Sequence, residues 1–349
     1  MKDNNKPIII WLLTGALMIF IMIIIGGTTR LTGSGLSIVE WNVVKGIVPP
    51  MNEHDWQDKF EKYQAFPQYK IQNKDMTLSE FKSIYWWEFI HRFWGRLIGI
   101  VYIIPLLFFW FKMNLSTNLK KHLIIAGLMG AFQGILGWLM VASGLIDKPW
   151  VSPYRLAAHL FTALILLAYL LLLAFKLIQV DTKPHPFSAK AKKLLQYTLI
   201  LFAVQLFYGA LMSGHKAALF YPTFPDFNGN LFPEHIFKLH PIWINIFENV
   251  AFIQVTHRSI GFIVFAIITF LSIKVYQEKF IELKGGLMLL FALTSLQILL
   301  GISTLILSIG HIPVVLGVVH QAVAVLILAA IIYLFAKISK ASFFSLDYE

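Results

Sequence analysis

Four histidines lie inside long apolar stretches of the sequence, where an ionisable side chain is costly unless it has a function. They are His91, His159, His257 and His320. A neutral imidazole is a good ligand for haem iron, and two opposed imidazoles form a low-spin b-type site. The four histidines therefore predict metal or haem binding at two sites. The alternatives are structural hydrogen bonds between helices and a relay of protons.

Small residues recur near these histidines. Each histidine is followed four residues later by glycine or alanine, which stacks on the same helix face and is predicted to leave a flat slot for a porphyrin edge. Three other apolar stretches carry Gln-x-x-x-Gly, beginning at Gln133, Gln205 and Gln297. We expect this pattern on the facing wall of the slot, where glycine allows close approach. Ordinary close packing of helices is the alternative for both patterns.

Charged side chains accompany the histidines. Glu88 lies three residues before His91 and shares its helix face. It is predicted either to act as an acid, a base or a charge-stabilising group beside the first site, or to pair with the helix dipole or Arg92. Arginine presents parallel donors to carboxylates, so arginines near the histidines are candidate partners of haem propionates, with snorkelling to the membrane interface as the alternative. These arginines are Arg92, Arg96, Arg155 and Arg258.

The elements that must position these residues are membrane-spanning helices. Of the 349 residues, 58% are hydrophobic and only 13% are charged, and the mean hydropathy is +0.70. Soluble domains carry about 25% charged residues, so this chain needs a lipid bilayer as solvent. Eight stretches are long enough to cross one as helices. They cover residues 8–27, 88–111, 122–142, 154–178, 194–213, 250–275, 285–308 and 313–337.

The histidine and glutamine patterns recur in both halves of the chain. They predict an all-α integral membrane protein of two pseudo-symmetric four-helix bundles, residues 1–180 and 181–349. Four spans return the chain to its starting side, so the repeat is parallel. All four histidines are then expected at similar depth near the outer ends of their helices. The long loop 28–86 is rich in aromatic residues and turns, and it is expected to fold as a cap on the N-terminal site.

Lysine residues are concentrated in short loops that share one side of the membrane, which the positive-inside rule assigns to the cytoplasm. Both termini are therefore predicted to be cytoplasmic, and the short segment before the first span favours a bacterial cytoplasmic membrane. The net charge of +11 follows from this topology, so no nucleic-acid partner is predicted. The chain contains no cysteine, which excludes disulfides, iron–sulfur clusters and thiolate ligation of haem.

Several motifs resemble the haem A synthase family, and they follow one another in the family's order along nearly the whole chain. The first external loop carries residues 26–37 (GGTTRLTGSGLS), Trp41 and residues 46–50 (GIVPP). Residues 88–92 (EFIHR) and 154–159 (YRLAAH) are similar to the family's first histidine motifs. Further matches are residues 143–145, 223–225, 248–249, 257–258 and 320–321. Because cysteine is absent, the chain resembles the branch that includes the mitochondrial-type enzymes, and a thiol-based step is excluded.

The resemblance implies an oxidoreductase that acts on a CH group. Haem A synthases oxidise the C8 methyl of haem O to a formyl group, with water as the oxygen source. The resemblance implies that His91 and His159 flank the substrate haem O and that Glu88 assists the chemistry. It implies that His257 and His320 ligate a haem B cofactor. The partners that it implies are membrane lipid, a haem O synthase and cytochrome oxidase assembly factors.

Two other classes of protein also place histidines in a membrane. The main alternative is a non-enzymatic b-type cytochrome that transfers electrons through haems held by paired histidines. A transporter with a proton relay is the second. Glu88 favours an enzyme, because the matching position before His257 is Gln254, which carries no acid.

Overall fold

The computed structural model describes residues 5–40, 45–145, 149–178, 189–277 and 281–338. Eight of its helices are long and apolar enough to cross a membrane, which confirms the all-α membrane fold. Their ends lie within a few residues of the predicted ones, except at the start of α4. These helices are α1 (Lys6–Leu31), α4 (Leu78–Lys112), α5 (Thr117–Ala142), α6 (Pro153–Ile178), α7 (Ala189–Gly214), α9 (Val250–Gln277), α10 (Ile281–Ile306) and α11 (Val314–Ile338).

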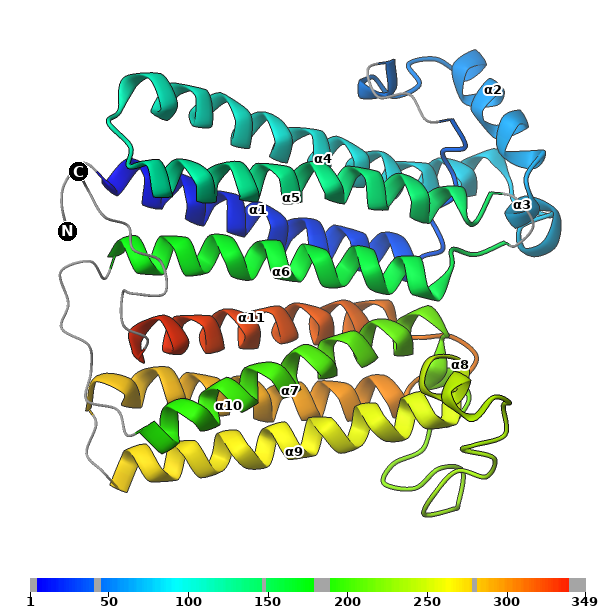
Figure 1. Cartoon of the computed structure of the whole chain (residues 1–349). Coiled ribbons are helices and arrows are strands. Elements are labelled where there is room, and N and C mark those ends of the chain that lie inside the picture. The colour runs from blue at the N-terminus through cyan, green and yellow to red at the C-terminus, as the bar shows by residue number, and fades with distance from the viewer. Residues whose placement is uncertain (1–4, 41–44, 146–148, 179–188, 278–280, 339–349) are drawn as a thin grey trace.

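The long helices form two groups of four (Figure 1). In the N-terminal group, α1 packs on α4 and α6, and α5 packs on α6; in the C-terminal group, α7 packs on α9 and α11, and α10 packs on both α9 and α11. The groups correspond in chain order, since α1 and α7 each pack on the second and fourth long helices of their group, and α5 and α10 each pack on the fourth. The grouping agrees with a parallel repeat. The predicted division between residues 180 and 181 lies outside the described residues.

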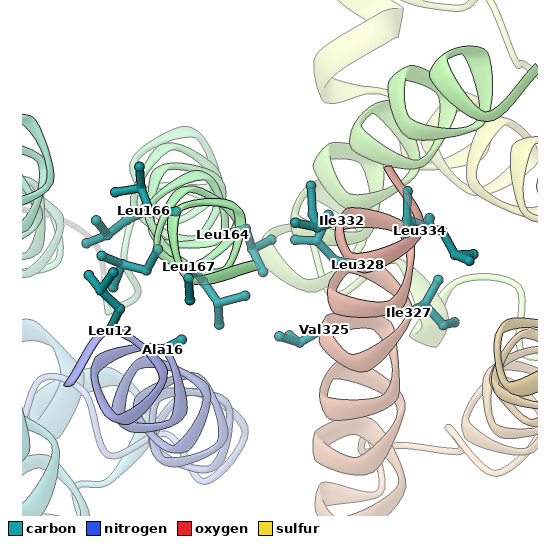
Figure 2. Close-up of a cluster of buried hydrophobic side chains, with 14 of the residues drawn as sticks. Leu12, Ala16, Leu164, Leu166, Leu167, Val325, Ile327, Leu328, Ile332 and Leu334 are labelled. Atoms are coloured by element: carbon teal, nitrogen blue, oxygen red, sulfur yellow. The ribbon is translucent and has the colours of Figure 1, made fainter. Parts of the chain in front are cut away.

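The two groups meet along α1, α6, α7 and α11. Helix α11 packs on α1 and α6, and α6 also packs on α7. Figure 2 shows aliphatic side chains of α1, α6 and α11 that belong to the main hydrophobic core, which runs through both groups and the contact between them. The labelled side chains are nearly inaccessible. Lipid tails are as apolar as leucine, so close van der Waals packing holds these helices together. The labelled residues of this core include Leu12, Leu164, Leu167, Val325 and Leu328.

The connection between α1 and α4 carries two further helices, α2 (Glu53–Gln64) and α3 (Pro67–Gln72). They pack with the first turns of α4 around a small aromatic core that includes Trp56, Phe60, Tyr63 and Phe81. We call residues 45–77 the outer cap, where outer means the end of the helix groups that lies away from Lys6 and Ile338. The described part of the predicted loop is therefore folded and lies at one end of α4 and α5 (Figure 1).

The predicted loop boundaries, 28 and 86, are wrong at both ends. Residues 28–31 form the last turn of α1, and residues 78–86 already belong to α4. Helix α4 begins early because Thr77 and Glu80 form a capping box, in which each side chain accepts a backbone N–H of the other residue. Hydropathy identifies only the membrane part of this helix and misses the turns that pack on the outer cap.

The two groups differ at one contact between neighbouring helices, which we call the seam: α4 with α5 in the N-terminal group and α9 with α10 in the C-terminal group. Helices α9 and α10 pack closely, and Phe265 stacks on Phe291 between them with ring centroids 5.8 Å apart. Helices α4 and α5 touch much less. When the groups are aligned on their histidines and glutamines, the positions of this aromatic pair are occupied by Gly99 and Gly127. A side chain at Gly99 would meet nothing within 4 Å, whereas one at Gly127 would meet Cε1 of Tyr102 at 3.2 Å. The hydroxyl of Tyr102 on α4 donates to the backbone oxygen of Leu123 on α5 at 2.6 Å.

Candidate functional site

Each intramembrane histidine packs against a glycine of a neighbouring helix. A methyl group on Gly301 would lie 2.9 Å from Cε1 of His320, which is closer than ordinary contact, so only glycine admits the imidazole there. The other three distances are 3.1 to 3.3 Å. The same contact thus recurs in register in both groups, which supports the predicted equivalence of the four histidines. The pairs are Gly26 with His91, Gly137 with His159, Gly209 with His257 and Gly301 with His320.

The Gln-x-x-x-Gly pattern supplies three of these glycines, and its glutamine also reaches the histidine. The Nε2 atoms of Gln205 and His257 are 3.4 Å apart, and those of Gln297 and His320 are 3.3 Å apart. With its amide oriented to donate, Gln133 lies 3.2 Å from Nδ1 of His159. The pattern therefore holds the histidine of the adjacent helix, which is a more direct role than the predicted facing wall.

The glycines four residues after two of the histidines do not leave an empty slot. A side chain on Gly261 would meet Gln205 Nε2 at 3.2 Å, and one on Gly95 would meet Met22 Cε at 3.3 Å. These glycines admit a side chain from the preceding long helix of their group. The spacing was correctly interpreted as a need for a small residue, but the neighbour that requires it is a protein side chain.

A cavity of about 270 Å³ lies in the C-terminal group, and both His257 and His320 line it. Most of its lining is aliphatic or aromatic. Nδ1 of each histidine and Oε1 of Gln205 and Gln297 are buried and have no hydrogen-bond partner among the described residues. Buried polar groups are almost always bonded, so four in one cavity indicate a missing partner. Two imidazoles in an apolar cavity suit the metal and the macrocycle of a haem.

The cavity is completed by residues from the other group of helices. Gly27 and Arg30 of α1 and Leu160 of α6 line it together with the histidines. Gln321 of α11 donates its Nε2 to the backbone oxygen of Ile23 at 3.0 Å and so fixes α1 at this wall. The C-terminal site is therefore built by both halves of the chain.

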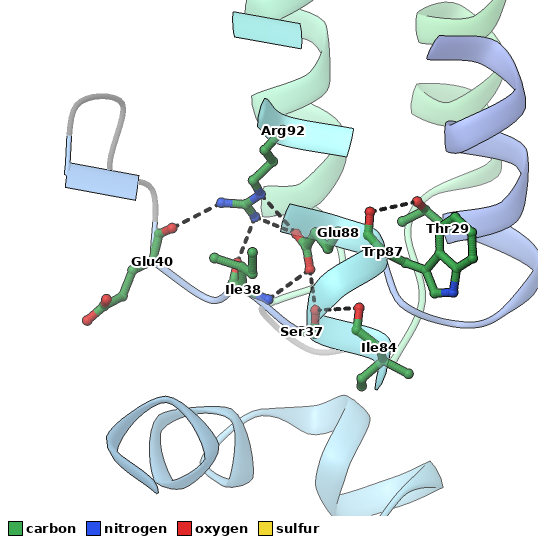
Figure 3. Close-up of polar contacts among 8 residues, drawn as sticks. All are labelled: Thr29, Ser37, Ile38, Glu40, Ile84, Trp87, Glu88 and Arg92. Carbon is green, nitrogen blue, oxygen red and sulfur yellow. Dashed lines mark hydrogen bonds and ion pairs between the residues drawn. The ribbon is translucent and has the colours of Figure 1, made fainter. Parts of the chain in front are cut away.

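Glu88 lies in a closed network of donors at the outer end of the N-terminal group (Figure 3). The carboxylate is 2% exposed. Its Oε2 accepts hydrogen bonds from Ser37 Oγ and Ile38 N, both at 2.8 Å, and its Oε1 accepts from Nε and Nη2 of Arg92. The predicted salt bridge to Arg92 is thus confirmed. Glu88 also ties the chain after α1 to α4.

Arg92 and Arg258 occupy matching positions one residue after their histidines and make matching contacts. Arg92 donates to the backbone oxygens of Ile38 and Glu40 at 2.7 and 3.1 Å. Arg258 donates to those of Tyr221, Thr223 and Asp226 at 2.9 to 3.1 Å, in the connection between α7 and α9. Each arginine therefore holds the external connection of its own group. Their predicted role toward haem propionates stays a prediction.

The remaining predicted arginines lie near the N-terminal site. Arg155 is exposed at the start of α6 and donates to the backbone oxygen of Leu139 at 2.6 Å, near the end of α5. Arg96 lies one turn beyond Arg92 on α4. Arg30 was not among the predicted site residues, although it lines the C-terminal cavity. Its place in the GGTTR segment, directly after an apolar span, was the available signal.

Comparison with known proteins assigns the chain to a family. Residues 9–332 match the COX15-CtaA family, described as cytochrome oxidase assembly protein. The chain belongs to this family.

Relatives match over almost their full length. A protein of Flavobacterium psychrophilum named heme A synthase is 42% identical, over 97% of this chain and 99% of its own. A protein of Nitrosomonas eutropha with the same name is 41% identical, over 97% of this chain and 95% of its own. A third protein named heme A synthase, from Bartonella henselae, is 39% identical, over 94% of this chain and 91% of its own.

Proposed function

We propose that this protein is a haem A synthase, which oxidises the C8 methyl group of haem O to a formyl group with oxygen taken from water. The conversion also releases protons and electrons, so the site must pass both on. The observation that carries the proposal is the repeated histidine–glycine contact in two equivalent helix groups. The names of the relatives, at about 40% identity over nearly the whole chain, support the same substrate.

The two groups are proposed to have different tasks. His257 and His320 would hold a resident haem B, since they line one cavity and each keeps an unpartnered ring nitrogen. A haem held by two imidazoles supplies one-electron transfer. His91 and His159 would flank the substrate haem O. The less extensive packing of α4 on α5 than of α9 on α10 supports this division, because a substrate must enter and leave whereas a cofactor stays.

Glu88 is proposed to assist the chemistry as a base or as a negative group near the developing charge. It lies one turn from His91, and Arg92 and Ser37 fix its position. The equivalent residue beside His257 is Gln254, which donates to the backbone oxygen of Tyr221 at 3.2 Å. The N-terminal group therefore has a carboxylate where the C-terminal group has a neutral amide.

The protein is proposed to reside in a bacterial cytoplasmic membrane with both termini in the cytoplasm. Its substrate haem O is apolar enough to travel in lipid, and a haem O synthase and cytochrome oxidase assembly factors are the proposed protein partners. The eight apolar helices support a multi-pass location.

The test is co-expression of the full chain with a source of haem O, followed by extraction of the bound haems and their mass analysis. We expect haem A together with haem B. A protein that binds haem B at both histidine pairs and yields no haem A would instead be a b-type electron-transfer cytochrome. A protein without bound haem would contradict both functions.

A further inference from the structure

Arg30 is a cation of the N-terminal group that reaches the C-terminal cavity. It lies in the last turn of α1, and its Nη2 donates to the backbone oxygen of Ser213 at 2.7 Å and to that of Gly214 at 3.3 Å, at the end of α7. Arg30 also lines the cavity that holds His257 and His320. Its position therefore links the two groups at the site itself.

The height of Arg30 above the histidines follows from helix geometry. Gly209 packs on His257, and Ser213 is four residues further along α7. One turn of helix rises about 5.4 Å. The guanidinium on the Ser213 carbonyl thus lies roughly one turn toward the outer end from the imidazole. The guanidinium therefore lies on the outer side of the level at which the two imidazoles would hold a ligand.

The charge of the cavity fits an anionic ligand. Arg30 and Arg258 line it, and no Asp or Glu is among the described residues that do so. Both Nη atoms of Arg258 already donate to backbone oxygens of the connection between α7 and α9. The buried Nε has no hydrogen-bond partner among the described residues in either arginine, and the Arg30 guanidinium donates to them through Nη2 alone. A buried guanidinium donor without a partner costs free energy that a carboxylate would recover.

Capping α7 explains only part of this arrangement. The carbonyls of Ser213 and Gly214 attract any cation through the helix dipole. They account for Nη2 and leave Nε without a role. Ser213 is also the residue that corresponds to Arg30 in the repeat, so the cation is present at one of the two sites only. The asymmetry follows the proposed division between a permanent and an exchanging haem.

We propose that Arg30 binds a carboxylate of the ligand in the C-terminal cavity, which is a propionate of haem B if the proposed function holds. The N-terminal half then supplies a binding residue to the cofactor site of the C-terminal half.

The test compares two porphyrins in the full-length protein prepared without haem. Iron protoporphyrin IX and its dimethyl ester are titrated while the Soret band is recorded. A hydrogen bond to a charged group contributes about 1.5–3 kcal/mol, so the wild type is expected to prefer the free acid by roughly ten- to a hundredfold. Arg30→Gln should lose most of this preference. Lys216→Gln is the control, because it removes an exposed cation that lies at the same outer end but does not line the cavity. This variant should keep the preference for the free acid.

The results of this test distinguish an error in the role of Arg30 from an error in the proposed function. Equal weakening of both porphyrins in Arg30→Gln, with the acid preference kept, would show a purely structural role and overturn the proposal. If Arg30→Gln does not fold, the wild type and Arg30→Lys decide: equal affinity of the wild type for acid and ester overturns the proposal, and partial preference in the lysine variant supports it. A wild type without any low-spin haem spectrum would instead contradict the proposed function.

Discussion

Replacing Glu88 by glutamine separates its structural role from its proposed chemical one. The side chain keeps its shape, but an amide nitrogen at Oε2 cannot accept from Ile38 N, and the charge that pairs with Arg92 is lost. Breaking a buried ion pair costs about 3–5 kcal/mol. Since Glu88 ties the chain after α1 to α4, we expect the cost to appear as opening of the outer cap. The open fraction should rise by roughly two to three powers of ten or more.

Two measurements on the Glu88→Gln protein check this reasoning. Limited proteolysis in intact membranes reports opening of the outer cap, and haem A formed per mole of folded protein reports chemistry. Arg92→Gln is the matched control, because it removes the same ion pair and keeps the carboxylate. We expect both variants to be cleaved faster. Product should be abolished in Glu88→Gln and only reduced in Arg92→Gln, which keeps the carboxylate but loosens its position. Protease resistance equal to that of the wild type would refute the stability argument, and normal product per folded molecule would refute the chemical role.

Three further predictions address the haem cavity and the outer cap. Replacing His257 or His320 with alanine should abolish or shift the low-spin haem spectrum, and unchanged spectra in both variants would contradict the ligand assignment. Gly301→Ala should displace the imidazole of His320 and lower haem occupancy by tenfold or more. Gly285→Ala is the control on the same helix, because a methyl group there would meet nothing within 4 Å. It should keep normal haem occupancy and raise the stability of the protein by up to about 1 kcal/mol. Tyr63→Phe removes a fully buried hydroxyl that donates to Gln68 and accepts from Asn73. The outer cap should lose about 1–3 kcal/mol of stability, which faster proteolysis of residues 45–77 would report. An unchanged rate of cleavage would show that these hydrogen bonds do not limit opening of the outer cap.

The membrane helices and the equivalent histidines were predictable from the sequence, because both leave a local signal. A span appears as a long apolar run, and the repeat appears as the same residue types at the same spacing, as with His91 and His257. The start of α4 was missed because Thr77 and the turns after it are polar enough to resemble a loop. Their helical state depends on a cap and on aromatic packing, which hydropathy does not register.

The contacts of the charged residues were harder to predict. Sequence position could not decide whether Arg92 and Arg258 point to a ligand or to the backbone of an external connection, because the connection is placed only by the fold. Arg30 was missed for the opposite reason. Its neighbours in the chain belong to one half of the protein, while the cavity it lines holds the histidines of the other half.

The two seams differ in what closes them. Between α9 and α10, a molecule that moved sideways would have to part Phe265 from Phe291, which costs about 0.5–1.5 kcal/mol beyond the area exposed. Between α4 and α5, the matching positions are Gly99 and Gly127, and the seam is instead crossed by Tyr102, whose hydroxyl donates to the backbone oxygen of Leu123 at 2.6 Å. One fold, repeated twice, thus closes one seam with an aromatic stack and the other with a single tyrosine hydrogen bond.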